Sequence, residues 1–237
     1  MPARNVVKIY YENGFYHVYN RGVEKRTIFL DNQDYTVFLH FLKKYLTPVP
    51  ETSAESANFW GAASSEFREA PYESLYGEID LLAYCLMPNH YHLLLQQKKI
   101  DSMIKLLRRV CTSYVIYFNK KYNRVGSLFQ GIYKAVEIDT EQYLLHVSRY
   151  IHLNPFELFT EVQPLQRCGL LREYSWSSYP DYYGNRSTLW VKTQPVLSYF
   201  SSTKNRNPGF ANINSYQKFV EDYIIDPREA IGTLSLD

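Results

Sequence analysis

The sequence lacks the features that mark secreted, disulfide-bonded and membrane-spanning proteins. Its three cysteines, Cys85, Cys111 and Cys168, show no Cys-x-x-Cys spacing, so neither a disulfide framework nor a structural zinc knot is indicated. No stretch approaches the ~18 uninterrupted apolar residues that a membrane span needs. The first residues also lack the apolar core of a signal peptide. We therefore expect a cytoplasmic protein with no membrane partner.

The length of 237 residues is enough to bury a full core. We expect one catalytic domain over residues 1–180, interrupted by a surface excursion at about residues 48–74. That excursion is rich in Ser, Ala and Glu and shows little periodicity. Residues 181–237 are expected to form a C-terminal tail with a short helix. This length leaves no room for an additional helicase domain.

The charge of the chain is unevenly distributed, although the net charge is only +2. Residues 98–134 hold nine basic residues against the single acid Asp101, so the rest of the chain is net acidic. A local positive field of this kind suits a bound polyanion. Aromatic residues lie between the basic ones and offer faces on which unpaired bases could stack, although several must belong to the core. They are Tyr114, Tyr117, Phe118, Tyr122, Phe129 and Tyr133.

The order of the expected elements indicates the fold. Strands are predicted at residues 15–20, 78–87, 91–97 and 132–138, and amphipathic helices at 34–46, after Asp101, from Thr140 to about Leu153, and at 215–225. Asp101 and Thr140 are the expected N-terminal caps. The order strand, helix, strand, strand, helix, strand predicts an α+β ferredoxin-like sandwich, an antiparallel sheet with helices on one face, plus a C-terminal extension.

Two pairs of residues carry the chemical interest. His90 and His92 are predicted to lie on one strand, where alternate side chains share a face, while Tyr91 points to the other face. Two imidazoles on one face can hold one metal ion. Tyr150 and Asn154 are one helical turn apart, so a phenol and an amide oxygen share a face of the later helix.

Each of these residues taken alone has a simple structural interpretation: a packing histidine, a core tyrosine, a turn-forming asparagine before Pro155. Taken together they are the parts that metal-assisted phosphoryl transfer requires, with His90, His92 and Asn154 as ligands and Tyr150 as the nucleophile. Attack by Tyr150 would join the protein covalently to DNA. His146, one turn before Tyr150, could orient or deprotonate it, although an ordinary supporting or surface role is the simpler interpretation.

At these residues the chain resembles the REP-associated tyrosine transposases of the single-tyrosine, HUH-type superfamily. The resemblance runs from YHVYNRGVEKRTIF through AYCLMPNHYHLLL and YNRVGSLFQGIYKAVEID to YLLHVSRYIHLNP and YSWSSY. It places His90, Tyr91 and His92 on the HUH motif, Tyr150 on the nucleophile and Asn154 on the third metal ligand. It also implies a ferredoxin-like fold, in agreement with the order of the elements.

The resemblance implies a function in some detail. It implies cleavage of single-stranded DNA beside a palindromic hairpin, a 5′-phosphotyrosine intermediate and dependence on Mg²⁺ or Mn²⁺, without a nucleotide cofactor. The expected partner is single-stranded or hairpin DNA, so the protein is nucleoid-associated when bound, and a homodimer stays open. The expected DNA-binding residues are Arg21, Lys105, Arg108, Arg109, Lys120, Lys121, Arg124 and Lys134. The alternatives are a hairpin-binding protein without turnover and a nickase of the rolling-circle initiator type.

Overall fold

The computed structural model describes residues 10–49, 72–201 and 215–222. Within them, four strands form one antiparallel sheet in the order β2-β3-β1-β4. They are β1 (Phe15–Arg21), β2 (Ile79–Met87), β3 (His90–Gln97) and β4 (Lys134–Ile138). Helix α1 (Asn32–Leu46) follows β1, and α2 (Ser102–Lys121) lies between β3 and β4. This connectivity and strand order are those of the ferredoxin-like α+β sandwich, so the predicted fold class is confirmed.

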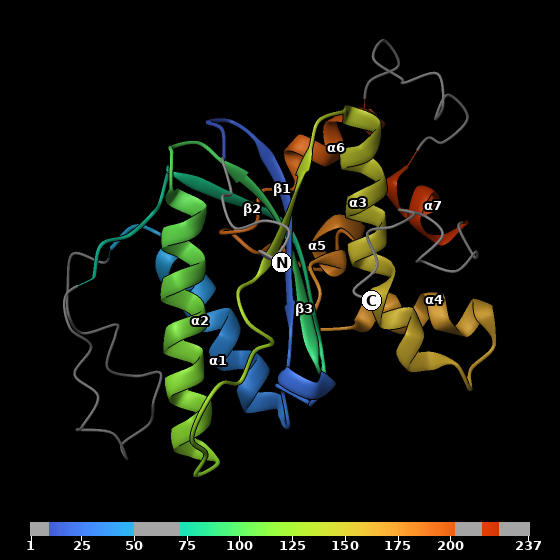
Figure 1. The fold of residues 1–237 in the computed structure, drawn as a ribbon. Coiled ribbons are helices and arrows are strands. Elements are labelled where there is room, and N and C mark those ends of the chain that lie inside the picture. Colours follow the sequence, from blue (N-terminus) through green and yellow to red (C-terminus); the bar gives the residue numbers. More distant parts are fainter. Residues whose placement is uncertain (1–9, 50–71, 202–214, 223–237) are drawn as a thin grey trace, which may run out of the picture.

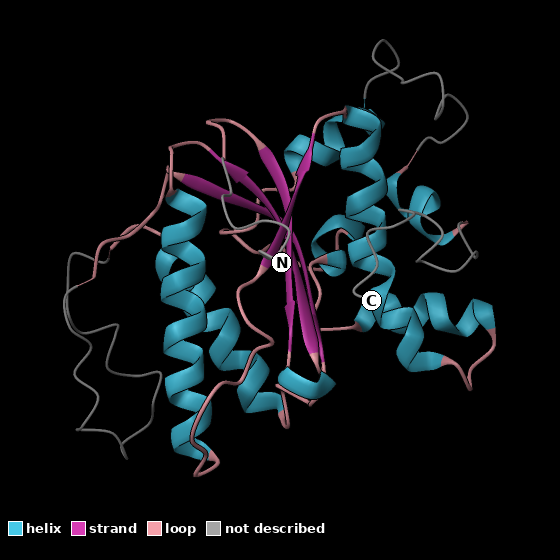
Figure 2. Ribbon diagram, in the orientation of Figure 1, coloured by secondary structure: helices cyan, strands magenta, loops and turns pink. Residues whose placement is uncertain are grey.

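Helices cover both faces of this sheet. On one face, α1 and α2 pack against each other, to the left of the strands in Figure 1, whereas α3 (Glu141–Leu153) contacts β2 and β3 on the other face. Figure 2 shows the same two helical layers on either side of the strands. The prediction of helices on one face describes α1 and α2, but it did not include α3 on the other face. The reason lies in β2, where Leu81–Met87 are all buried, as in a strand with two covered faces.

The first core lies between the sheet and the pair of helices α1 and α2. From β3 it receives Tyr91, Leu93 and Leu95. The six aromatic residues that could have stacked on bases also belong here, because three are buried in this core and three pack against it. The buried ones are Tyr114, Phe118 and Phe129, and the others are Tyr117, Tyr122 and Tyr133. The expectation that these rings bind DNA bases therefore finds no support.

The second core lies between the other face of the sheet and α3, and the C-terminal residues complete it. Helices α6 (Gln194–Ser201) and α7 (Tyr216–Glu221) contribute Val196, Tyr216, Phe219 and Val220. The predicted boundary at residues 180/181 falls inside α5 (Tyr179–Tyr183). Helices α6 and α7 of the tail thus belong to the same hydrophobic core as α3, whereas Val191 belongs to the first core.

Several segments after α3 were not indicated by the sequence pattern. The chain continues from α3 into the 3-10 helix η3 (Asn154–Phe159) and then α4 (Pro164–Glu173). Helices α5 and α6 are short, with five and eight residues. The predicted helix at 215–225 appears as α7, which begins after Ser215, whose hydroxyl accepts a hydrogen bond from Lys218 N.

Strand β2 contains one irregularity that sets the direction of its side chains. The pairing register with β3 shifts between Leu81 and Ala83, so Leu82 is an extra residue on the β2 side. Before the shift, Ile79 and Leu81 face the first core, and after it Tyr84 does. The bulge therefore rotates the remainder of β2 by one residue relative to a simple alternation.

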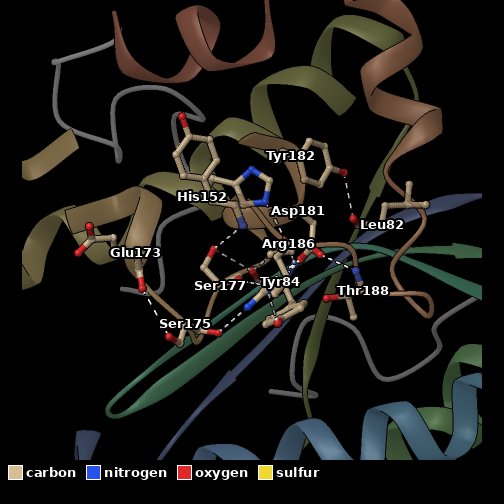
Figure 3. A network of polar contacts seen from close by, with 12 residues as sticks. Leu82, Tyr84, His152, Glu173, Ser175, Ser177, Asp181, Tyr182, Arg186 and Thr188 are labelled. Atoms are coloured by element: carbon tan, nitrogen blue, oxygen red, sulfur yellow. Dashed lines mark hydrogen bonds and ion pairs between the residues drawn. The ribbon is translucent and has the colours of Figure 1, made fainter. Parts of the chain in front are cut away.

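The segment after α4 is fixed to β2 by a buried polar network (Figure 3). The Arg186 guanidinium pairs with the Asp181 carboxylate at 2.8 Å and donates to the Ser177 carbonyl and to Tyr84 Oη. Tyr182 Oη donates to the Leu82 carbonyl at 2.9 Å. Because the Asp181 side chain is only 3% exposed, its charge needs the guanidinium partner, and the loop has a single well-defined position.

The helix caps follow one prediction and contradict another. Thr140 begins α3, with its hydroxyl accepting from Tyr143 N at 3.2 Å. Asp101 precedes α2, but its side chain forms no cap hydrogen bond, and its φ of 64° is in the left-handed region. The predicted Asp101 cap is therefore wrong. The first turn of α2 is capped instead by Gln97, whose side-chain oxygen accepts from Met103 N at 3.1 Å.

The predicted excursion lies mostly outside the described residues, as does the polar stretch before α7. Among the helices of the described ranges, none has the length and apolar character needed to cross a membrane.

We expect Tyr216→Phe to lower the free energy of unfolding by about 1–3 kcal/mol. Tyr216 Oη lies 2.7 Å from His152 Nδ1 and donates to Ser148 Oγ at 3.0 Å, and all three side chains are buried. Removing the hydroxyl leaves two buried polar groups on α3 without this partner. Urea unfolding measures the change, and Tyr76→Phe, at a tyrosine 56% exposed, is the control. Equal stability of both variants would show that α7 does not hold α3.

Candidate functional site

The predicted histidine pair lies on β3 as its spacing requires. His90 and His92 face α3, whereas Tyr91 points into the first core and packs on Phe38. The two imidazole rings lie 5.0 Å apart between centroids, at nearly right angles. Strand β3 is a central strand of the sheet, so His92 is fully buried between β1, β2 and α3.

Helix α3 brings the second pair onto the histidines. Asn154 Oδ1 lies 3.3 Å from His90 Nε2, and the Tyr150 ring lies 5.3 Å from the His92 ring in an edge-on arrangement. Residues separated by about sixty positions in the sequence thus meet because the apolar face of α3 packs on the sheet. The structure therefore brings together all four residues that the sequence singled out, although no observation tests their roles.

The ring orientation of His90 is set by its neighbour. His90 Nδ1 lies 2.6 Å from Asn89 Oδ1, and the Asn89 amide nitrogen donates to the Lys25 carbonyl at 3.3 Å. The amide oxygens on both sides of the ring can only accept, and the contact with Asn89 is the shorter, so we assign the proton of neutral His90 to Nδ1 and a lone pair to Nε2. That lone pair faces Asn154 Oδ1. The sequence pattern gave Asn89 no part in the site, so this role was missed.

The Asn154 side chain is oriented by the end of α3. Its Nδ2 donates to the Tyr150 carbonyl at 2.9 Å, so its Oδ1 is turned toward the histidines. The same carbonyl also accepts from the Asn154 backbone N–H. Pro155 has no N–H to continue the helical pattern. The side chain is 5% exposed, which limits it to this orientation.

Tyr150 is held in an apolar environment. The residue is 6% exposed, and burial, followed by the charge of the Glu157 carboxylate, raises the pKa of the Tyr150 phenol to about 12. The Asn154 side chain acts in the opposite direction and lowers this pKa. At neutral pH the phenol is therefore protonated and a poor nucleophile unless a positive charge is placed beside it.

A third histidine, His17 of β1, completes the cluster and was missed in the sequence. His17 Nε2 lies 2.9 Å from His92 Nδ1, with the two rings stacked at 5.1 Å. Burial lowers the pKa of His17 to about 3, that of His90 to about 4 and that of His92 well below its usual range, so all three imidazoles are neutral. The sequence signal for His17 was the alternation of side chains along β1, together with the presence of a histidine on the adjacent strand β3. It required knowing that β1 and β3 are neighbours.

His146 lies one turn before Tyr150 as predicted, and its contacts are with other residues. Its Nδ1 is 2.7 Å from the Arg149 guanidinium, and its ring packs on Phe219 of α7. Burial and the Arg149 charge lower the His146 pKa. These contacts favour a supporting role between α3 and α7, so we give His146 no part in the chemistry of Tyr150.

Of the predicted DNA-binding residues, Arg21 and Lys134 lie beside the cluster. Arg21 is opposite His90 in the strand pairing, and Lys134 is opposite Tyr19, so both side chains are on the histidine face of the sheet. They border a polar hollow of about 90 Å³. Its lining residues are Tyr19, Asn20, Arg21, Gln130, Ile132 and Lys134.

The other predicted DNA-binding residues belong to α2 or follow it, on the opposite face of the sheet. Lys121 Nζ lies 2.7 Å from Asp31 and 2.8 Å from Asp34, and Arg109 pairs with Glu73 at 3.2 Å. The Arg124 guanidinium lies over the Phe118 ring, while Lys105, Arg108 and Lys120 are exposed. Apart from Lys134, the positive segment therefore divides into residues that pair with acids of other segments and residues that lie far from the histidines.

The residues at the cluster fit a divalent cation. His92 Nε2 is buried and forms no hydrogen bond with the described residues, and His90 Nε2 and Asn154 Oδ1 already converge. Two neutral imidazoles and an amide oxygen are acceptable ligands for such an ion. In the described ranges there is no group of three or more His, Cys, Asp or Glu side chains that could hold a metal, so the amide is needed to complete this set.

One family model matches part of the chain. Residues 66–154 match the family model described as "Transposase IS200 like". Over this segment the chain is similar to the IS200-like transposases. The segment contains β2, β3, α2, β4 and α3 and ends at Asn154. The resemblance to a transposase family seen in the sequence is therefore confirmed.

Two further comparisons concern the curated proteins and the solved structures. The chain has no match among the curated proteins. It is similar to a solved structure described as "Structure of the REP associates tyrosine transposase bound to a REP hairpin", with 12% sequence identity and a TM-score of 0.49. The similarity covers 78% of this chain and 89% of that chain.

We expect Lys121→Met to destabilise the protein by about 1–3 kcal/mol without weakening DNA binding. The Asp34 side chain is fully buried, so losing the ammonium leaves its carboxylate without a counter-charge. Lys120→Met, at the neighbouring exposed lysine, should change stability by less than about 0.5 kcal/mol. Urea unfolding and a hairpin-binding titration measure the two effects. A stable Lys121→Met protein with reduced DNA affinity would restore Lys121 as a DNA contact.

Proposed function

We propose that this transposase is a metal-dependent single-stranded DNA endonuclease and strand transferase that acts at hairpin or REP-like sequences. The observation that carries the proposal is the convergence of His90, His92 and Asn154 beside the Tyr150 ring. The family match supports the general activity, and the motif resemblance supports the hairpin substrate. Acting on DNA, the protein would be cytoplasmic and associated with the nucleoid.

His90, His92 and Asn154 are the residues that would hold the cation, Mg²⁺ or Mn²⁺. Such an ion would polarise a phosphate oxygen and offset the charge that develops during attack. The protein supplies the orientation of the ligands: Asn89 fixes the His90 ring, and the Tyr150 carbonyl fixes the Asn154 amide. All of these side chains come from one chain, so the proposed site needs no second copy.

Tyr150 is the proposed nucleophile. As its proton leaves, the phenolic oxygen forms a bond to phosphorus and the bond from phosphorus to the 3′ oxygen breaks. The products are a 5′-phosphotyrosine and a free 3′-hydroxyl. Attack by another 3′-hydroxyl reverses the step and releases Tyr150, so strands can be rejoined without ATP. Burial of Tyr150 keeps water from the linkage, which favours joining over hydrolysis.

The polar hollow beside the cluster is the proposed entry for the DNA strand. Arg21 and Lys134 carry positive charge on the same face as the histidines. Arg21 Nε donates a 2.6 Å hydrogen bond to Gln130 Oε1, which fixes the Arg21 side chain. A phosphodiester at this position would extend toward Tyr150 past Tyr19. We therefore propose Arg21 and Lys134 as phosphate contacts, in preference to the residues of α2.

We expect Tyr150→Phe to abolish the covalent adduct while leaving hairpin binding intact. Full-length protein is incubated with Mn²⁺ and a labelled hairpin carrying single-stranded flanks, and the adduct is resolved on a denaturing gel. The variant lacks only the oxygen that attacks phosphorus. Tyr143→Phe, on the same helix, is the matched control and should form the adduct.

Three results would count against this proposal. An adduct that persists in Tyr150→Phe would refute Tyr150 as the nucleophile. Hairpin binding with intact DNA under every divalent metal would favour a binding protein without turnover. Nicking of duplex origin-like DNA without hairpin preference would favour a nickase of the rolling-circle initiator type.

We expect Lys134→Gln and Arg21→Gln each to weaken single-stranded DNA binding and to reduce its salt dependence. For one lost phosphate contact, the slope of log K against log salt should fall by about 0.7. Lys105→Gln and Arg108→Gln, on the far face of the sheet, are the controls and should keep the slope of the wild type. A loss confined to the α2 variants would place the DNA on α2 instead.

A further inference from the structure

His17 is buried next to the proposed metal ligands and has no place in the reaction described so far. It is 0% exposed and lies on β1 on the same face as His92. Its Nε2 is 2.9 Å from His92 Nδ1, and the two rings stack with an interplanar angle of 21°. Tyr19 and Tyr150 pack on the His17 ring at 5.0 and 5.8 Å. An imidazole held this tightly has one orientation toward His92.

The contact between the two imidazoles holds a single proton. Both rings are fully buried and neither has a carboxylate partner among the described residues, so two facing nitrogens 2.9 Å apart share one hydrogen. The proton is either on His92 Nδ1, with His17 accepting, or on His17 Nε2, with His92 accepting. In the second arrangement the remaining proton of His92 is on Nε2, where it blocks metal ligation.

The comparison with His90 indicates which arrangement the site uses. At His90, an oxygen that can only accept draws the proton to Nδ1 and leaves Nε2 free beside Asn154. At His92, the corresponding position is taken by the His17 ring, and two buried nitrogens of this pair, His92 Nε2 and His17 Nδ1, form no hydrogen bond with the described residues. With the shared proton on His92 Nδ1, His92 Nε2 keeps a lone pair, as His90 Nε2 does. The two ligands are then equivalent, each with its Nδ1 proton held by a neighbour.

We propose that His17 is a positioning residue that accepts the Nδ1 proton of His92 and so keeps His92 Nε2 available to a divalent cation. This inference rests on the proposed function, in which His92 is a ligand. Partners of this type orient the ligand ring and raise its basicity, and their removal typically weakens metal binding by about 10–100-fold. Here the partner is a neutral imidazole where a carboxylate or carbonyl is more usual, so the ligand set gains no negative charge.

The first test measures Mn²⁺ affinity of the full-length protein without DNA, from the electron paramagnetic resonance signal of free Mn²⁺. His17→Leu, which cannot accept a hydrogen bond, should weaken binding by about 10–100-fold. His17→Gln, whose amide oxygen can accept from His92, should recover most of the affinity. His40→Leu, on α1 across the sheet, is the control and should bind as the wild type does. Melting curves in EDTA show whether each variant folds.

The second test needs no variant. Nitrogen-15 spectra of the Mg²⁺-saturated wild type report the tautomer of each histidine ring. We expect His17 to carry its proton on Nδ1 and to show a protonless Nε2, with a coupling across the hydrogen bond to His92 Nδ1. A proton on His17 Nε2 would overturn the proposal, even if His17→Leu does not fold.

The outcomes separate this inference from the proposed function. If His92→Ala weakens Mn²⁺ binding and His17→Leu does not, His92 is a ligand and His17 does not position it. If His92→Ala leaves Mn²⁺ binding unchanged, His92 is not a ligand and both proposals fail. Loss in His17→Leu, recovery in His17→Gln and an Nδ1 proton on His17 together support the positioning role.

Discussion

The packing of α3 on the sheet is the constraint on which the site depends. Neither half of the site has a function alone, because the imidazoles belong to β3 and the phenol and the amide belong to α3 and its end. The apolar side of α3, with Leu144, Val147 and Ile151, places Tyr150 over His92. On its other side, Tyr216 bonds to His152 and Ser148, so the C-terminal residues hold the helix from behind.

Much of this arrangement was predictable because it follows from local periodicity. Alternation in β3 separated His90 and His92 from Tyr91, and the spacing of one helical turn paired Tyr150 with Asn154. The order of elements gave the ferredoxin-like topology. The partners His17 and Asn89 could not be found in this way, since their roles depend on which strands are adjacent and on where one proton lies.

The clustering of basic residues in the sequence was a weaker guide to the site than the periodicity of the strands and helices. The basic residues between 98 and 134 are clustered in the sequence. In the fold, some of them form ion pairs and others lie on α2, far from the histidines. Lys121 forms an ion pair with the buried Asp34 at the start of α1. The acids that neutralise the basic segment therefore come from elsewhere in the chain. By contrast, Arg21 and Lys134 are far apart in the sequence and share one face of the sheet because β1 pairs with β4.

The extra residue Leu82 in β2 has a consequence for comparing this chain with its relatives. On either side of it, the residues that face α1 and α2 change from odd to even positions, with Leu81 before and Tyr84 after. An alignment that follows hydrophobic alternation through β2 without a gap would therefore assign Cys85 and Met87 to the wrong layer of the sandwich. A relative lacking one residue at this point would pair regularly through β2 and keep Tyr84 opposite Leu93, but it would lose the Leu82 carbonyl that accepts the Tyr182 hydroxyl.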